Sequence, residues 1–144
     1  MNKVVILIGI PGAGKSTRTK SLVDSLEAEK TFAIHSTDSY HMIEGKYSFQ
    51  PNKLGYFHRL NQESFKESLN KQVNLVICDN TNLKAIDRKF YIDEAKEHGY
   101  EVSYEIIGEF TDKFAEVCFK RNVHGVPLDS IKRMAKYAQL PEVE

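Results

Sequence analysis

The chain has 144 residues, and its 20 basic and 20 acidic side chains give a formal net charge of zero. A chain of this length suits a single domain that buries its own core without a disulfide or a structural metal. The neutral charge argues against a dedicated nucleic-acid clamp, which is usually basic, but it allows an enzyme that grips only the end of a strand.

Cysteine content and hydropathy indicate a cytosolic protein. Cys78 and Cys118 lie far apart in the chain without metal-ligand spacing, so we expect two free thiols. Pro11 interrupts the apolar N-terminal segment almost at once, and no apolar run reaches the ~20 residues of a membrane helix. We therefore expect a cytoplasmic protein with no signal peptide and no membrane partner, while its oligomeric state stays open.

Strands and helices are predicted to alternate along the chain. The segment 3–8 (KVVILI) is a continuous β-branched run, which is typical of a strand buried on both faces. Such alternation implies βαβ units, and hence an α/β fold with a parallel sheet of about four strands and helices on both faces. The other predicted strands are 31–35, 74–78 and 101–107, and the predicted helices are 15–29, 54–69, 84–98, 114–121 and 131–138. The segment 43–53 resists assignment and is predicted to be a mobile loop.

The segment 9–16 (GIPGAGKS) matches G-x-x-x-x-G-K-[ST] without a mismatch, between a buried strand and a helix. Its glycines allow positive φ, and successive N–H groups point at phosphate oxygens from the positive end of the helix. We expect Lys15 to reach the β- and γ-phosphates, Ser16 to ligate Mg²⁺ and Thr17 to bond an α-phosphate oxygen. The predicted site for ATP with Mg²⁺ consists of Gly12, Ala13, Gly14, Lys15, Ser16 and Thr17.

A candidate general base follows the second strand in the segment 35–40 (HSTDSY). Ligands of open α/β sheets bind at the carboxyl ends of the strands, so Asp38 is expected on the same rim as the phosphate loop. A kinase needs a base that takes the proton of the acceptor hydroxyl and orients it for in-line attack. Asp38 either does this or caps a short helix that runs through Tyr40.

The third strand ends in a second polar segment, 79–83 (DNTNL). Asp79 either holds a Mg²⁺-bound water or pairs with Arg88 and stiffens the loop, and we slightly favour the pairing. Thr81 and Asn82 are small and polar on the same rim. They either bind the acceptor or are ordinary turn residues.

A helix–loop–helix near the C-terminus, about residues 111–128, is similar to the lid that closes over ATP in small P-loop kinases. Phe114, Val117, Cys118 and Arg121 recur at helical spacing and predict one buried stripe. Arg121 then either stabilises charge on the transferring phosphoryl group or merely snorkels past the edge of the core.

Four blocks in matching order resemble the polynucleotide 5′-hydroxyl kinase family of P-loop kinases. The family includes the kinase domain of phage polynucleotide kinase-phosphatase and that of certain animal ubiquitin-ligase-binding proteins. The resemblance covers nearly the whole chain and implies a single P-loop kinase domain over residues 1–144. It also implies ATP-dependent transfer of the γ-phosphate to the 5′-OH end of single-stranded RNA or DNA. The blocks are 9–17, 36–40 (STDSY), 79–83 (DNTNL) and 120–127 (KRNVHGVP).

The resemblance also implies roles for individual residues. Asp38 would be the general base, and Lys15 and Arg121 would clamp the transferring phosphoryl group. Ser16 would hold Mg²⁺, and Thr81 would touch a phosphate of the acceptor strand.

The chain departs from the phage pattern at two positions. His41 stands where an arginine grips the phosphate of the acceptor, and His124 stands in a shorter lid loop that lacks a second arginine. A neutral imidazole offers one donor and little charge, whereas arginine offers a charged fork. We expect both histidines to contact substrate. No D-x-D-x-[TV] phosphatase signature occurs, so we expect a kinase without a phosphatase domain.

Three functions remain open from the sequence. The four ordered blocks favour a polynucleotide kinase. Neutral charge and the missing arginine favour a kinase for a sugar acid, nucleoside or antibiotic. A non-catalytic nucleotide-binding module is least favoured, because a pure binder has no use for Asp38 as a base.

Overall fold

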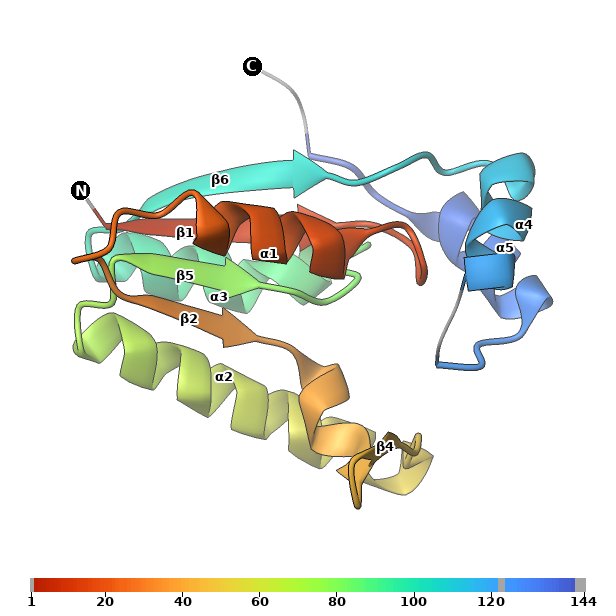
Figure 1. The fold of residues 1–144 in the computed structure, drawn as a ribbon, viewed down its shortest axis with the longest axis horizontal. Helices are drawn as coiled ribbons and strands as arrows, with labels where there is room; N and C mark the ends of the chain where they lie inside the picture. The colour runs from red at the N-terminus through yellow and green to blue at the C-terminus, as the bar shows by residue number, and fades with distance from the viewer. Residues whose placement is uncertain (1, 122–123, 142–144) are drawn as a thin grey trace.

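The computed structural model describes residues 2–121 and 124–141. Its main sheet has four strands, all parallel, in the order β2-β5-β1-β6, as Figure 1 shows. This arrangement confirms the predicted parallel sheet. The strands are β1 (Lys3–Ile8), β2 (Phe32–His35), β5 (Leu75–Cys78) and β6 (Glu101–Ile106).

Helices cover both faces of this sheet, as the sequence predicts. On one face, α1 (Lys15–Asp24) packs against the side chains of Val5, Leu7, Leu75 and Ile77. On the other face lie α2 (Leu54–Asn70) and α3 (Ala85–Glu97). Two shorter helices, α4 (Asp112–Arg121) and α5 (Leu128–Tyr137), pack on each other beyond the carboxyl ends of the strands (Figure 1).

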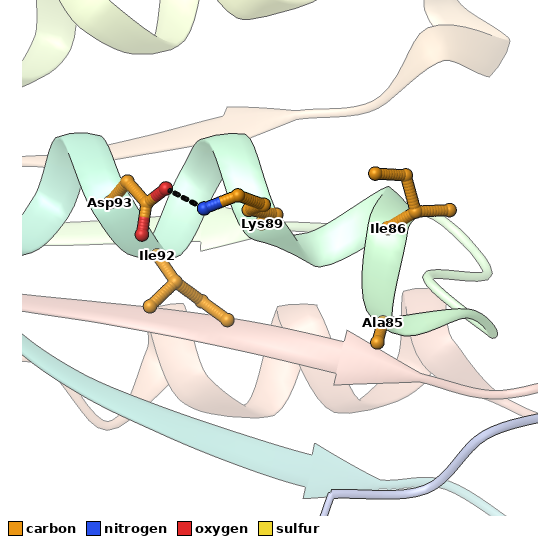
Figure 2. Close-up of a pocket in the computed structure, with 5 residues that line it drawn as sticks. All are labelled: Ala85, Ile86, Lys89, Ile92 and Asp93. Atoms are coloured by element: carbon orange, nitrogen blue, oxygen red, sulfur yellow. Dashed lines mark hydrogen bonds and ion pairs between the residues drawn. The ribbon is translucent and has the colours of Figure 1, made fainter.

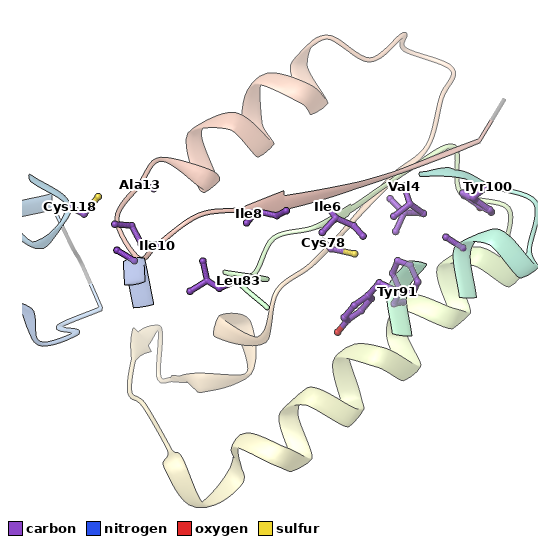
Figure 3. Packing of buried hydrophobic residues seen from close by; sticks show 14 of the residues in the cluster. Val4, Ile6, Ile8, Ile10, Ala13, Cys78, Leu83, Tyr91, Tyr100 and Cys118 are labelled. Carbon is purple, nitrogen blue, oxygen red and sulfur yellow. The ribbon is translucent and has the colours of Figure 1, made fainter. Parts of the chain in front are cut away.

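The central strand β1 pairs with β5 along one edge and β6 along the other, and it is buried on both faces because helices cover both sides of the sheet. Its side chains alternate between the two faces, so Val4, Ile6 and Ile8 join the larger core cluster. Figure 3 shows this cluster running along the strand to Ala13 of the phosphate loop and Cys118 of α4. The core therefore ties the phosphate loop directly to the last pair of helices.

The segment that resisted assignment has defined structure. It contains a short antiparallel hairpin, in which Met42 pairs with Tyr47 and Ile43 with Lys46. Its turn residues Glu44 and Gly45 have φ of 51° and 80°, the positive values that a tight hairpin turn requires. The elements are η1 (Thr37–His41), β3 (Met42–Ile43), β4 (Lys46–Tyr47) and η2 (Pro51–Lys53).

The buried stripe of α4 differs from the predicted one. Ala115 and Cys118 are buried, whereas Val117 is 44% exposed and Arg121 is exposed. The phosphate loop packs on the side of Cys118, and this contact sets which face of the helix is covered.

No helix in the described part of the chain is long and apolar enough to cross a membrane.

Candidate active site

The phosphate loop joins β1 to α1, and two of its glycines hold conformations that other residues rarely adopt. Gly12 and Gly14 have φ of 83° and 113°. A Cβ on Gly12 would lie 2.6 Å from the carbonyl oxygen of Cys118 on α4. Glycine therefore serves two needs at position 12, the positive φ and the close approach of α4.

Lys15 lies at the centre of the site. Its Nζ donates to the carbonyl oxygens of Gly9 at 2.9 Å and Ile10 at 3.0 Å. Burial lowers the pKa of Lys15, and the nearby carboxylates of Asp79 and Asp38 act in the opposite direction. The ammonium group therefore lies in the field of two acidic side chains that come from two different strand ends.

Asp79 belongs to the phosphate-loop side of the site, which corrects our preference for a pairing with Arg88. It accepts a hydrogen bond from Thr19 Oγ1 at 3.0 Å. Burial raises the pKa of Asp79, and the Thr19 hydrogen bond and the charge of Lys15 oppose this rise. Arg88 instead donates to the carbonyl oxygen of Asn82 at 2.7 Å and to that of Gln139 at 2.6 Å.

Asp38 lies in η1, directly after β2, and its side chain is 51% exposed. Ser36, not Asp38, occupies the N-cap position of η1, so the helix-capping alternative does not apply. Asn80 fixes this turn, because its Oδ1 accepts from the Thr37 backbone N–H at 2.8 Å and from Thr37 Oγ1 at 2.9 Å. Asn80 thus connects the end of β5 to the turn that carries Asp38.

Two further side chains meet Asp38, one from the hairpin and one from the connection between α4 and α5. Tyr47 lies close enough to Asp38 to interact with its carboxylate, and burial followed by the charge of Asp38 raises the pKa of Tyr47. His124 Nδ1 lies 3.5 Å from Asp38 Oδ2. The rings of Tyr47 and His124 stack on each other, with centroids 4.0 Å apart and planes at 14°. The sequence pointed to His124, but nothing singled out Tyr47, because the hairpin was unassigned.

Asn82 does not present its side chain to a ligand, contrary to the first expectation. It is 4% exposed, and its Nδ2 donates to the carbonyl oxygens of Leu7 at 2.8 Å and Cys78 at 3.3 Å. Its φ of 48° fits the alternative of turn chemistry. Thr81 is partly exposed beside it, and its carbonyl oxygen accepts from Gly9 N–H at 3.1 Å.

His41 is also placed differently from the expectation that it grips the acceptor. It is 2% exposed, and its Nδ1 accepts from the backbone N–H of Gln50 at 3.0 Å. Its ring packs on Phe49 and Phe57, with centroids 5.0 and 4.7 Å away. Burial lowers the pKa of His41, so the ring is an uncharged part of the packing that holds the hairpin.

Arg121 ends α4, and its described contacts are with its own helix. The guanidinium lies 5.7 Å from the centre of the Phe114 ring, and Nη2 lies 3.9 Å from Cys118 Sγ. The side chain is exposed and does not continue a buried stripe. Residues 122 and 123 of the same block lie outside the described residues.

Comparison with known proteins places the chain in a family. A family model described as AAA domain (AAA_33) matches residues 4–141. The chain belongs to this P-loop family. Human (Homo sapiens) NEDD4-binding protein 2 is 35% identical over 136 residues, which are 94% of this chain and 8% of that protein.

Solved structures share the fold of this AAA domain. A chain of the Pnkp1/Rnl/Hen1 RNA repair complex superimposes with a TM-score of 0.73 and 19% identity, over 94% of this chain and 43% of that one. The Mycobacterium tuberculosis APS kinase CysC in complex with AMPPNP and APS has a TM-score of 0.59 and 15% identity, over 99% of this chain and 84% of that one. Together with the family match, these neighbours confirm the P-loop kinase fold and the resemblance to polynucleotide kinases.

The donor atoms of this AAA domain suit a magnesium ion that arrives with a nucleotide. Ser16 and Asp79 line the same surface groove, and both offer the oxygen atoms that Mg²⁺ prefers. Among residues 2–121 and 124–141, no cluster of three or more His, Cys, Asp or Glu side chains could hold a metal ion. The two side chains therefore fit an ion that takes its remaining ligands from phosphate and water.

A second surface hollow lies on α3, and it contains none of the predicted site residues. Figure 2 shows Ala85, Ile86 and Ile92 at this hollow, with Lys89 and Asp93 paired at 2.7 Å. Its two charged groups neutralise each other within one helix, so it offers no chemistry comparable with that around Lys15.

Proposed function

We propose that the protein transfers the γ-phosphate of ATP to the 5′-OH end of single-stranded RNA or DNA. The observation that carries this proposal is the position of Asp38, an exposed carboxylate in a turn that Asn80 anchors to the end of β5, close enough to Lys15 for its charge to act on the ammonium group. A nucleotide-binding module needs Lys15 but has no use for an exposed carboxylate fixed opposite it. The fold that the protein shares with a chain of an RNA repair complex supports a polynucleotide as the acceptor.

Each group has a role in this proposal. Lys15 exchanges the carbonyl oxygens of Gly9 and Ile10 for the β- and γ-phosphates. Asp38 accepts the proton of the 5′-hydroxyl and orients its oxygen for in-line attack. Ser16 and Asp79, which line one groove, would hold the Mg²⁺ that neutralises charge on the phosphates, and Thr17 would bond the α-phosphate.

The lid, about residues 111–128, closes over ATP in this proposal. Its helix α4 already contacts the phosphate loop through Cys118 and Gly12. Arg121 turns from Phe114 toward the transferring phosphoryl group, where its charge stabilises the transition state. Thr81 lies on the rim as a contact for an acceptor phosphate.

A small-molecule acceptor is the second candidate, favoured by the burial of His41. A polynucleotide acceptor has a phosphate that His41 was expected to bind, and the buried ring of His41 does not reach such a phosphate. The fold that the protein shares with an APS kinase bound to APS supports this second candidate.

Replacing Asp38 with Asn tests the role of the base. Asn keeps the size of the side chain but cannot accept the proton, so we expect kcat to fall by about 10²-fold or more while ATP affinity stays nearly unchanged. The matched control is Asp93→Asn, which removes a paired surface carboxylate on α3. An equal loss of ATP binding in Asp38→Asn would show that Asp38 is structural and not a base.

A further inference from the structure

Two flat rings stack on each other beside Asp38, the candidate general base. The Tyr47 and His124 rings are nearly parallel at 4.0 Å, and both side chains also contact the Asp38 carboxylate. The pair therefore lies where an acceptor hydroxyl would have to approach. Whatever carries that hydroxyl meets these rings first.

The two rings come from elements with different support. Tyr47 lies in β4, which pairs with β3, and its ring also lies 5.9 Å from the buried ring of His41. His124 lies in the connection between α4 and α5, next to Gly125 with its φ of 69°. Tyr47 is therefore supported by a hairpin and a buried ring, whereas His124 lies in a connection between two helices.

We propose that Tyr47 is the stacking platform for the 5′-terminal base of the acceptor, with the His124 ring on the other face of that base. This inference rests on the proposed function and names how the acceptor is recognised. A base between the two rings needs them to separate to about twice their present spacing of 4.0 Å. The terminal base then takes the contact that His124 makes with Tyr47 in the free protein.

Charge and chemistry favour a base over a phosphate at this position. The two side chains beside Asp38 are a phenol and an imidazole, and the His41 ring is buried instead of reaching the rim. Every nucleobase has a flat face, so stacking recognises an end without reading its sequence. Binding of this kind also suits a chain of zero net charge, because few phosphate contacts are needed.

The test compares two oligonucleotides that each have a 5′-OH, one with an ordinary terminal nucleoside and one with an abasic terminal sugar. Binding of 3′-labelled oligonucleotide is measured by fluorescence anisotropy with a non-hydrolysable ATP analogue present, and transfer from ATP is measured in parallel. Wild-type protein should bind the ordinary end about tenfold more tightly, as expected for one stacked base. Tyr47→Leu should remove this preference without changing the affinity for the ATP analogue.

Two variants control for loss of structure. Tyr47→Phe keeps the ring but loses the hydroxyl on Asp38, so it should keep the preference for the base while the pH profile of transfer changes. Tyr104→Leu replaces a partly exposed tyrosine on β6, at the opposite edge of the sheet, and should behave as wild type.

Equal binding of both oligonucleotides by the wild type, or an intact preference in Tyr47→Leu, would overturn the stacking platform even if transfer occurs. A base-dependent affinity without any transfer would instead support the platform and overturn the proposed function.

Discussion

The phosphate loop and the lid helix α4 lie so close together that one added methyl group at Gly12 would disturb their contact. An alanine at position 12 would place its Cβ 2.6 Å from the carbonyl oxygen of Cys118 and 3.2 Å from its Cβ. The backbone there has a φ of 83°, which costs an L-residue about 1 kcal/mol. Moving backbone to relieve the overlap adds about 1–3 kcal/mol. We therefore expect Gly12→Ala to lower the free energy of unfolding by about 2–4 kcal/mol and to weaken ATP binding as α4 is displaced.

Gly99→Ala is the matched control for this effect. Gly99 has nearly the same φ, 77°, but a Cβ there would meet no atom within 4 Å. Gly99→Ala should lower the free energy of unfolding by about 1 kcal/mol in urea denaturation and leave the ATP affinity unchanged. If Gly12→Ala loses no more stability than Gly99→Ala and binds ATP as wild type, the loop does not depend on the contact with α4.

Three further substitutions test the supports of the site. Asn80→Ala leaves the two Thr37 donors without their acceptor, so stability should fall by about 1–3 kcal/mol and kcat should fall more than ATP affinity, as judged by denaturation and steady-state kinetics. Arg88→Met leaves two carbonyl oxygens without a charged donor, and calorimetry should show a loss of about 2–4 kcal/mol without a specific loss of ATP binding. Burial lowers the pKa of His35 from 6.5 to about 4. Between pH 6.5 and 4 the folded state therefore binds fewer protons than the unfolded state, and the free energy of unfolding should fall by about 3 kcal/mol as the pH drops through this range. In pH-dependent denaturation, His35→Gln should make this acid limb of the stability curve flatter.

Each of these predictions has an outcome that contradicts it. Unchanged kinetics in Asn80→Ala would mean that the turn of Asp38 is held by other contacts. Wild-type stability in Arg88→Met would show that the buried guanidinium does not stabilise the fold. An equally steep fall in stability with acid in His35→Gln would show that other groups cause it.

The sheet and the phosphate loop were readable from sequence because local patterns determine them. The run at 3–8 is apolar at every position after Lys3, as a strand covered on both faces requires, and it became the central strand β1. The glycines and Lys15 sit at fixed offsets that only one loop conformation satisfies. For the same reason Asp38 was placed correctly on the rim, since topology alone brings the ends of β1, β2 and β5 together.

The errors arose where contacts that no local sequence pattern reveals decide whether a side chain is buried. His41 and Asn82 are polar, yet both are buried, because a backbone N–H of Gln50 and the carbonyl oxygens of Leu7 and Cys78 supply their hydrogen bonds. The stripe on α4 was misplaced because the phosphate loop determines which side is covered. Tyr47 gave no signal, since its importance comes from a hairpin of two-residue strands that periodicity cannot detect.

The most direct test of the account is transfer of labelled γ-phosphate from ATP, with Mg²⁺, to short single-stranded RNA and DNA that carry a 5′-OH. Lys15→Ala and Asp38→Ala serve as paired controls, and ATP binding is measured for each protein. We expect label on the 5′ end with wild-type protein and its loss in both variants, with ATP binding retained in Asp38→Ala. Absence of label on both polymers while wild-type protein binds ATP would contradict the polynucleotide acceptor.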